Sequence, residues 1–164
     1  IMIIVKKNIL SFDNMSFKCA VGKNGITKNK VEGDGCTPAG EYSIIKIYYR
    51  QDKVVLPSIK IPSIAISKNF GWCDDVNSDY YNKIITFPFK HRAEILYRND
   101  NIYDILCVID YNQNPVVKNK GSAIFLHIAK PNYAGTEGCI ALNEPDLIRL
   151  LTELNIKTNI QIIS

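Results

Sequence analysis

The 164-residue sequence lacks any long apolar run and carries little excess charge of either sign. A membrane-spanning helix needs about 20 consecutive apolar residues, and no segment approaches that length, so we expect no transmembrane segment. The 20 basic and 16 acidic residues leave a net charge of +4. This excess is too small and too scattered to indicate nucleic-acid binding, although an anionic polymer such as cell-wall material remains a compatible partner.

Histidines and closely spaced cysteines are also scarce. The two histidines, His91 and His127, show no metal-ligand spacing to each other or to a carboxylate cluster. The cysteines are odd in number, widely spaced and without a CxxC motif, so the sequence indicates neither a disulfide framework nor a zinc site. We therefore expect no metal site. The five cysteines are Cys19, Cys36, Cys73, Cys107 and Cys139.

The amino-terminal segment does not have the order of a secretory signal. Its apolar residues 1–5 precede Lys6 and Lys7, whereas a signal peptide places its positive charges before a longer apolar stretch. No export signal is therefore visible in this sequence.

Most of the sequence predicts β-strands. Residues 9–22 predict a hairpin with Asp13-Asn14 as its turn. Residues 31–49 predict a loop punctuated by glycine and proline that leads into a strand rich in β-branched and aromatic residues. Two further strands are expected within residues 101–111 and 121–129, and a last one within residues 156–163.

One helix is predicted, over residues 143–154. Asn143 is a suitable N-cap, and Pro145 falls in the first turn, where a missing N–H is tolerated. Leucines at helical spacing form one apolar stripe. Residues 70–83 are interpreted as a polar, aromatic loop. The sequence thus predicts a single β-rich domain over residues 1–164, with a late helix packed on a sheet.

The pair His127 and Cys139 is the strongest candidate for chemistry. Cysteine reacts as the thiolate, so a nucleophilic cysteine needs a base nearby. The loop between the two residues is long enough to fold back and bring them together. Backbone N–H groups around Gly138 and Cys139 would then bind a developing oxyanion. The alternative is that Cys139 is a small buried core residue and His127 a histidine satisfied within the core.

Two segments together resemble the YkuD-type L,D-transpeptidase catalytic domain. The segment "GDGCTPAGEY" (residues 33–42) is similar to its G-D-x-x-T-P-x-G-x-[FY] motif. The segment "HIAKPNYAGTEGCI" (residues 127–140) is similar to its catalytic segment, with a histidine on a strand, a loop, and then a nucleophilic cysteine after glycine. The resemblance spans nearly the whole chain, and the "GWCDD" loop (residues 71–75) indicates one particular branch.

Two positions depart from the family pattern. Glu137 stands where the family usually has histidine, and Ala141 where it has arginine or asparagine. Either Glu137 orients the substrate or it faces solvent. The departures leave the transferase-versus-hydrolase balance open.

The resemblance implies a β-sandwich of packed sheets with a helix against them, and chemistry on peptidoglycan stem peptides without a cofactor. Cys139 would attack the carbonyl of the third stem residue, with His127 as the base and then as the acid that protonates the leaving amine of D-Ala. An amine from another stem would then resolve the thioester and form a cross-link. Water would instead give an L,D-carboxypeptidase, and a third hypothesis is an inactive peptidoglycan-binding domain. The resemblance also implies a location in the bacterial periplasm or cell envelope, and sensitivity to carbapenems.

Further candidates for substrate contact lie in and near the "GWCDD" loop. Trp72 would offer a stacking face, and Asp74 and Asp75 would meet an amino group of the stem. The alternatives are that Trp72 is a packing anchor and that the aspartates cap turns. The remaining candidates for substrate contact are Asn82, Thr136 and Glu137.

Overall fold

The computed structural model describes all 164 residues and is mainly β, as predicted. The only α-helix is α1 (Glu144–Glu153), and a short 3-10 turn occupies Pro131–Tyr133. The strands are β1 (Met2–Lys6), β2 (Ile9–Phe12), β3 (Met15–Lys18), β4 (Ile26–Thr27), β5 (Thr37–Pro38), β6 (Gly40–Tyr49), β7 (Ser63–Ala65), β8 (Phe70–Cys73), β9 (Ile84–Thr86), β10 (Ala93–Ile95), β11 (Ile105–Ile109), β12 (Phe125–Ile128), β13 (Ile140–Leu142) and β14 (Asn159–Ile163).

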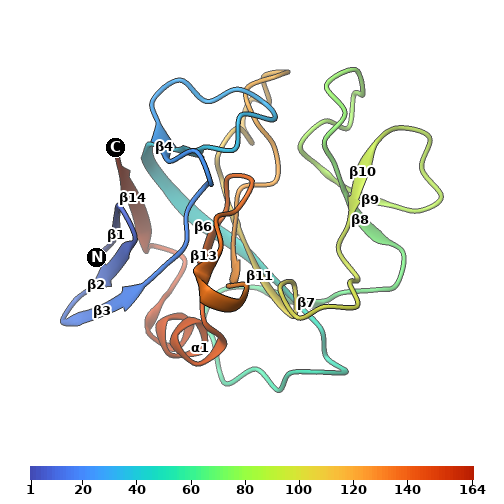
Figure 1. Cartoon of the computed structure of the whole chain (residues 1–164). Coiled ribbons are helices and arrows are strands. Elements are labelled where there is room, and N and C mark those ends of the chain that lie inside the picture. Colours follow the sequence, from blue (N-terminus) through green and yellow to red (C-terminus); the bar gives the residue numbers. More distant parts are fainter.

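A nine-stranded sheet forms the body of the molecule, in the order β13-β12-β11-β6-β14-β1-β2-β3 with β7 beside β6. A separate three-stranded sheet has the order β10-β8-β9, and β4 pairs with β5. Figure 1 shows the small sheet on one side of the molecule, β1 to β3 and β14 on the other, and β11 and β13 between them. No helix in the structure is long and apolar enough to cross a membrane.

The elements with clear local signals form where the sequence predicts them. Strands β2 and β3 make the hairpin, and Asp13 at its turn has a φ of 52°. Helix α1 begins after Asn143, whose side chain accepts a hydrogen bond from the Asp146 N–H at 2.9 Å. Burial of the leucine stripe of α1 against the sheet then fixes the helix in place.

One expectation is wrong. Residues 70–83 were expected to be a loop throughout, but Phe70–Cys73 form β8, the central strand of the small sheet. This strand has only four residues, too few for a periodic pattern. It is stabilised by pairing with β9 and with β10, which lies about twenty residues further along the chain.

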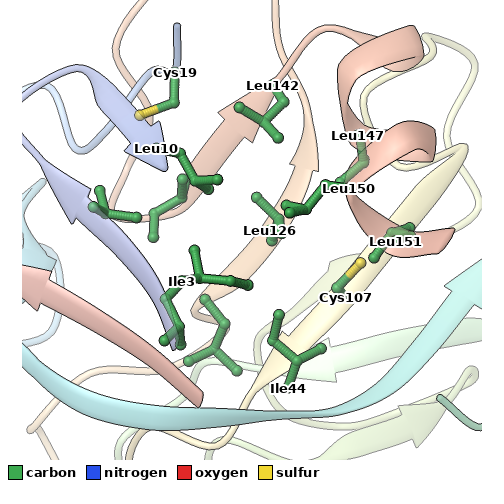
Figure 2. Close-up of a cluster of buried hydrophobic side chains, with 14 of the residues drawn as sticks. Ile3, Leu10, Cys19, Ile44, Cys107, Leu126, Leu142, Leu147, Leu150 and Leu151 are labelled. Carbon is green, nitrogen blue, oxygen red and sulfur yellow. The ribbon is translucent and has the colours of Figure 1, made fainter. Parts of the chain in front are cut away.

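Strand β12 lies between two apolar cores. Leu126 and Ile128 point into the larger core, which contains the leucines of α1 (Figure 2). Phe125, on the opposite face, joins a smaller core with Trp72 and Tyr103. Because side chains alternate along a strand, His127 shares the face of Phe125. The predicted active-site face is therefore separated from the main core by a single strand.

Candidate active site

The pairing of β12 with β13 brings His127 and Cys139 onto one face of the sheet. These strands are parallel, with Leu126 opposite Ile140 and His127 opposite Ala141. Extending this register by one residue places Cys139 beside Phe125, on the face that also carries His127. The strand spacing and the rise per residue give a separation of about 8 Å between the Cα atoms of the two residues. Their side chains are therefore diagonal neighbours.

The His127 imidazole has a defined tautomer. Its Nδ1 lies 2.8 Å from the backbone carbonyl oxygen of Ile128. A carbonyl oxygen can only accept, so Nδ1 carries the proton and Nε2 is left as the basic nitrogen. Burial lowers the pKa of His127 to about 4, although the Ile128 carbonyl acts in the opposite direction. The ring is consequently neutral at physiological pH.

The Cys139 thiol is held by backbone groups of the strand beside it. Its Sγ donates to the carbonyl oxygen of Ala123 at 3.2 Å and accepts from the Phe125 N–H at 3.4 Å. No hydrogen bond joins Sγ to His127 in this state. Burial raises the pKa of the Cys139 thiol to about 12, and the nearby negative charge of Glu94 acts in the same direction. The resting pair is thus a thiol and a neutral imidazole.

Two threonines shape the loop that carries Cys139. Thr136 Oγ1 donates to the Cys139 carbonyl at 2.6 Å and accepts from the Gly138 N–H at 3.1 Å. Thr37 Oγ1 donates to the Gly138 carbonyl at 2.8 Å and accepts from the Gly22 N–H at 2.9 Å. The Gly138 N–H, predicted to bind an oxyanion, is thus already engaged, whereas the Cys139 N–H has no acceptor within the chain.

Gly138 itself is required by this geometry. Its φ is +149°, and a Cβ at this position would lie 2.8 Å from the Cys36 carbonyl oxygen. Only glycine allows the loop to approach the "GDGCTPAG" segment so closely. The two segments that carry the family resemblance, about 100 residues apart in sequence, are therefore in direct contact.

Asp34 organises the other end of that segment. Its carboxylate accepts from the N–H groups of Val31 and Cys36, both at 2.9 Å, and forms an ion pair with Lys30. The Lys30 side chain is only 5% exposed. This pairing places a buried ammonium group at the wall of the cavity described next.

A cavity of about 760 Å³ opens onto both predicted catalytic residues. Most of the residues around it are polar, and they include both basic and acidic side chains. The charged and titratable residues around it are Lys30, Glu32, Asp74, Arg92, Glu94, Arg98, Tyr103, His127, Lys130, Glu137 and Cys139. A charged, zwitterionic substrate is better suited to this lining than an apolar one.

Trp72 and Asn82 lie behind the cavity rather than in it. Trp72 is 4% exposed and packs edge-on against Phe125, with ring centroids 5.1 Å apart. The side-chain oxygen of Asn82, Oδ1, accepts from the Trp72 Nε1–H at 2.9 Å and from the Ala123 N–H at 3.0 Å. Ala123 has a φ of 54°, which is unusual for a residue other than glycine. Asn82 therefore helps to position Ala123, whose carbonyl accepts the hydrogen bond of the Cys139 thiol, and Trp72 is a packing anchor.

The remaining predicted contacts divide between the cavity and the surface. Asp74 lines the cavity and pairs with Arg92 at 3.1 Å. Asp75 does not line it, and its carboxylate accepts from the N–H groups of Asn77 and Arg92 at a turn. Thr136 and Glu137 line its rim, and the exposed Glu137 carboxylate pairs with Lys23 at 2.8 Å.

Sequence reasoning missed Glu94 and Tyr103. Tyr103 is buried, donates a hydrogen bond to Glu94 Oε1 and packs edge-on against the His127 ring, with centroids 5.3 Å apart. Neither residue belongs to a recognisable motif. Their only sequence signal is a lone glutamate in a short strand and a tyrosine just before a buried one.

A family model for the L,D-transpeptidase catalytic domain, YkuD, matches residues 3–162. The chain belongs to the YkuD family. The match covers nearly the whole sequence, so both segments quoted above lie inside one family domain, a type that acts in L,D-transpeptidation of peptidoglycan. A search of the curated proteins found no match. No group of three or more His, Cys, Asp or Glu side chains is arranged to hold a metal ion.

Proposed function

We propose that the protein is a cysteine L,D-transpeptidase that cross-links peptidoglycan stem peptides through a thioester on Cys139. The observation that carries this proposal is the placement of Cys139 and His127 on one face of adjacent strands, both lining the charged cavity. Membership in the YkuD family supports the substrate class.

The first half-reaction starts with rotation of the Cys139 side chain from Ala123 toward His127. His127 Nε2 takes the thiol proton as sulfur attacks the carbonyl carbon of the third stem residue. The oxyanion accepts a hydrogen bond from the free Cys139 N–H. The C–N bond to D-Ala then breaks, and the leaving nitrogen takes the proton from Nε2, which leaves a thioester and a neutral imidazole.

In the second half-reaction, an amine of another stem attacks the thioester carbonyl. The C–S bond breaks, the sulfur regains a proton through His127, and an amide cross-link remains. Attack by water would instead release a free acid, and the same residues would then perform a hydrolysis. The polar cavity of about 760 Å³ has room for a donor and an acceptor peptide segment.

The test is incubation of wild type and Cys139→Ala with purified disaccharide-tetrapeptides, followed by mass spectrometry of the products. We expect cross-linked dimers and free D-Ala with wild type only. Tripeptides without dimers would identify a hydrolase in place of a transferase. Products that do not depend on Cys139, or none at all, would contradict both enzymatic functions. A reaction on this substrate places the protein's work in the cell envelope.

A further inference from the structure

Most charged groups of the cavity are already paired, and Glu94 is an exception. Asp74 pairs with Arg92 at 3.1 Å, and Glu137 pairs with Lys23 at 2.8 Å. Glu94 has no cationic side chain within 4.0 Å of its carboxylate, and its one side-chain partner is the Tyr103 hydroxyl. A partly buried carboxylate without a cation is unfavourable unless something else supplies the positive charge.

No basic side chain of the cavity, Lys130 included, forms an ion pair with Glu94, although the charge of Arg98 acts on it from a longer distance. Arg98 forms two hydrogen bonds with Asp100, at 2.8 and 2.6 Å, and Lys30 pairs with Asp34. Glu32, the other acid without a cation, accepts hydrogen bonds from two hydroxyl groups, those of Tyr81 and Ser122. Glu94 is therefore the cavity carboxylate that has neither a cationic partner nor more than one hydrogen bond.

Glu94 is also fixed next to the reacting groups. Tyr103 donates to it, and the same tyrosine ring packs edge-on against His127 and against Phe125, with centroids 5.3 and 5.8 Å apart. Among the charges that act on Cys139, that of Glu94 raises its pKa most, after burial. The carboxylate thus lies at the end of the cavity where the thioester would form.

The second half-reaction has a proton left over. The acceptor arrives as an ammonium group, R–NH3⁺, and its nitrogen must lose two protons to become the amide R–NH–C(O). His127 can take one of them and return it to the departing sulfur. The other proton needs a second acceptor, because an ammonium group has no lone pair and cannot attack.

We propose that Glu94 binds the ammonium group of the acyl acceptor and takes its first proton, which prepares the amine to attack the Cys139 thioester. This inference rests on the proposed transpeptidase function. The proton passes from nitrogen to the Glu94 carboxylate, the lone pair attacks the carbonyl carbon, and His127 receives the second proton. Glu94 later releases its proton to solvent through the open side of the cavity.

The environment of Glu94 suits this role. Burial raises the pKa of its carboxyl to about 7, and the negative charges of Asp74 and Glu32 act in the same direction. The Tyr103 hydrogen bond and the positive charge of Arg98 act to lower it. A base is most effective when its pKa is near the working pH. Once Glu94 has taken the proton of the acceptor it is neutral, so its charge does not oppose departure of the Cys139 sulfur in the second half-reaction.

The experiment measures the two half-reactions separately in wild type and Glu94→Gln. Acylation is followed as D-Ala released in the first turnover, without acceptor. Aminolysis is followed as the ratio of cross-linked to hydrolysed product when an amine-bearing stem peptide is added. We expect Glu94→Gln to lower this ratio at least tenfold while D-Ala release stays within about twofold. Glu153→Gln, the same change at the exposed end of α1, should match wild type in both.

A second variant keeps the carboxylate but removes its hydroxyl partner. Tyr103→Phe should lower the same ratio by a smaller factor, because Glu94 loses its fixed position. An unchanged ratio in Glu94→Gln would overturn the inference. An equal drop in acylation and aminolysis would also overturn it, since Glu94 would then serve the donor. If wild type itself releases no D-Ala through Cys139, the proposed function has failed. That outcome is distinct from the two results with Glu94→Gln that would overturn the inference.

Discussion

At the scale of single residues, the proposed catalytic pair rests in its neutral form. The thiol of Cys139 has a pKa raised to about 12 by burial, and the imidazole of His127 has a pKa lowered to about 4 by burial. A preformed thiolate–imidazolium pair would need shifts in the opposite directions. We therefore infer that the proton moves only as the substrate carbonyl arrives and Cys139 leaves the Ala123 carbonyl.

The pKa values of His127 and Glu94 predict opposite effects of pH on stability. Between pH 4.5 and 6.5 the unfolded chain protonates His127 and the folded protein does not, so this histidine makes stability rise with pH. In the same range the folded protein keeps the Glu94 proton that the unfolded chain loses, because its pKa is raised to about 7, so this group makes stability fall with pH. In wild type the two contributions largely cancel.

Single variants should expose each contribution. In Glu94→Gln the free energy of unfolding should rise more steeply with pH than in wild type. In His127→Gln the slope of this free energy with pH should be more negative than in wild type. Each difference in slope should be on the order of 1 kcal/mol per pH unit. Urea denaturation at a series of pH values measures both slopes. Slopes equal to that of wild type in both variants would contradict the assigned protonation states.

At the scale of elements, the site depends on contact between the segment before β6 and the loop before β13. Thr37→Val removes the hydroxyl that joins the Gly22 N–H and the Gly138 carbonyl. Leaving both groups without a partner should lower stability by about 1–3 kcal/mol. The displaced Cys139 should be acylated roughly tenfold to a hundredfold more slowly.

Thr37→Ser is the matched control, because it keeps the hydroxyl. Thermal unfolding and the rate of D-Ala release measure the two effects. If Thr37→Val and Thr37→Ser are acylated equally fast, the hydroxyl does not position the nucleophile.

The sequence predicted elements where local chemistry decides the structure. Asp13-Asn14 closes its hairpin by local turn geometry, and Asn143 caps α1 by a bond to a residue three positions away. Strand β8 was missed because its stability comes from β9 and β10, and no local pattern encodes those partners.

At the scale of the whole molecule, β12 connects stability with chemistry. One face of this strand is packed into the core against α1, and the other carries His127 toward the cavity. Packing of the core face of β12 therefore holds His127 in its position at the cavity. The proximity of Cys139 and His127 was predictable because only a short loop joins the strand of the histidine to the cysteine. Glu94 and Tyr103 were not, because only the packing of the small sheet against β12 brings them there.

The measurement that tests the central claim most directly is the mass of the protein after brief incubation with a tetrapeptide stem and an acid quench. We predict an adduct equal to the donor minus D-Ala, located on the peptide that contains Cys139. The adduct should be absent in Cys139→Ala and should disappear on addition of an amine acceptor. Release of D-Ala without any adduct on Cys139, or an adduct on another residue, would contradict the account.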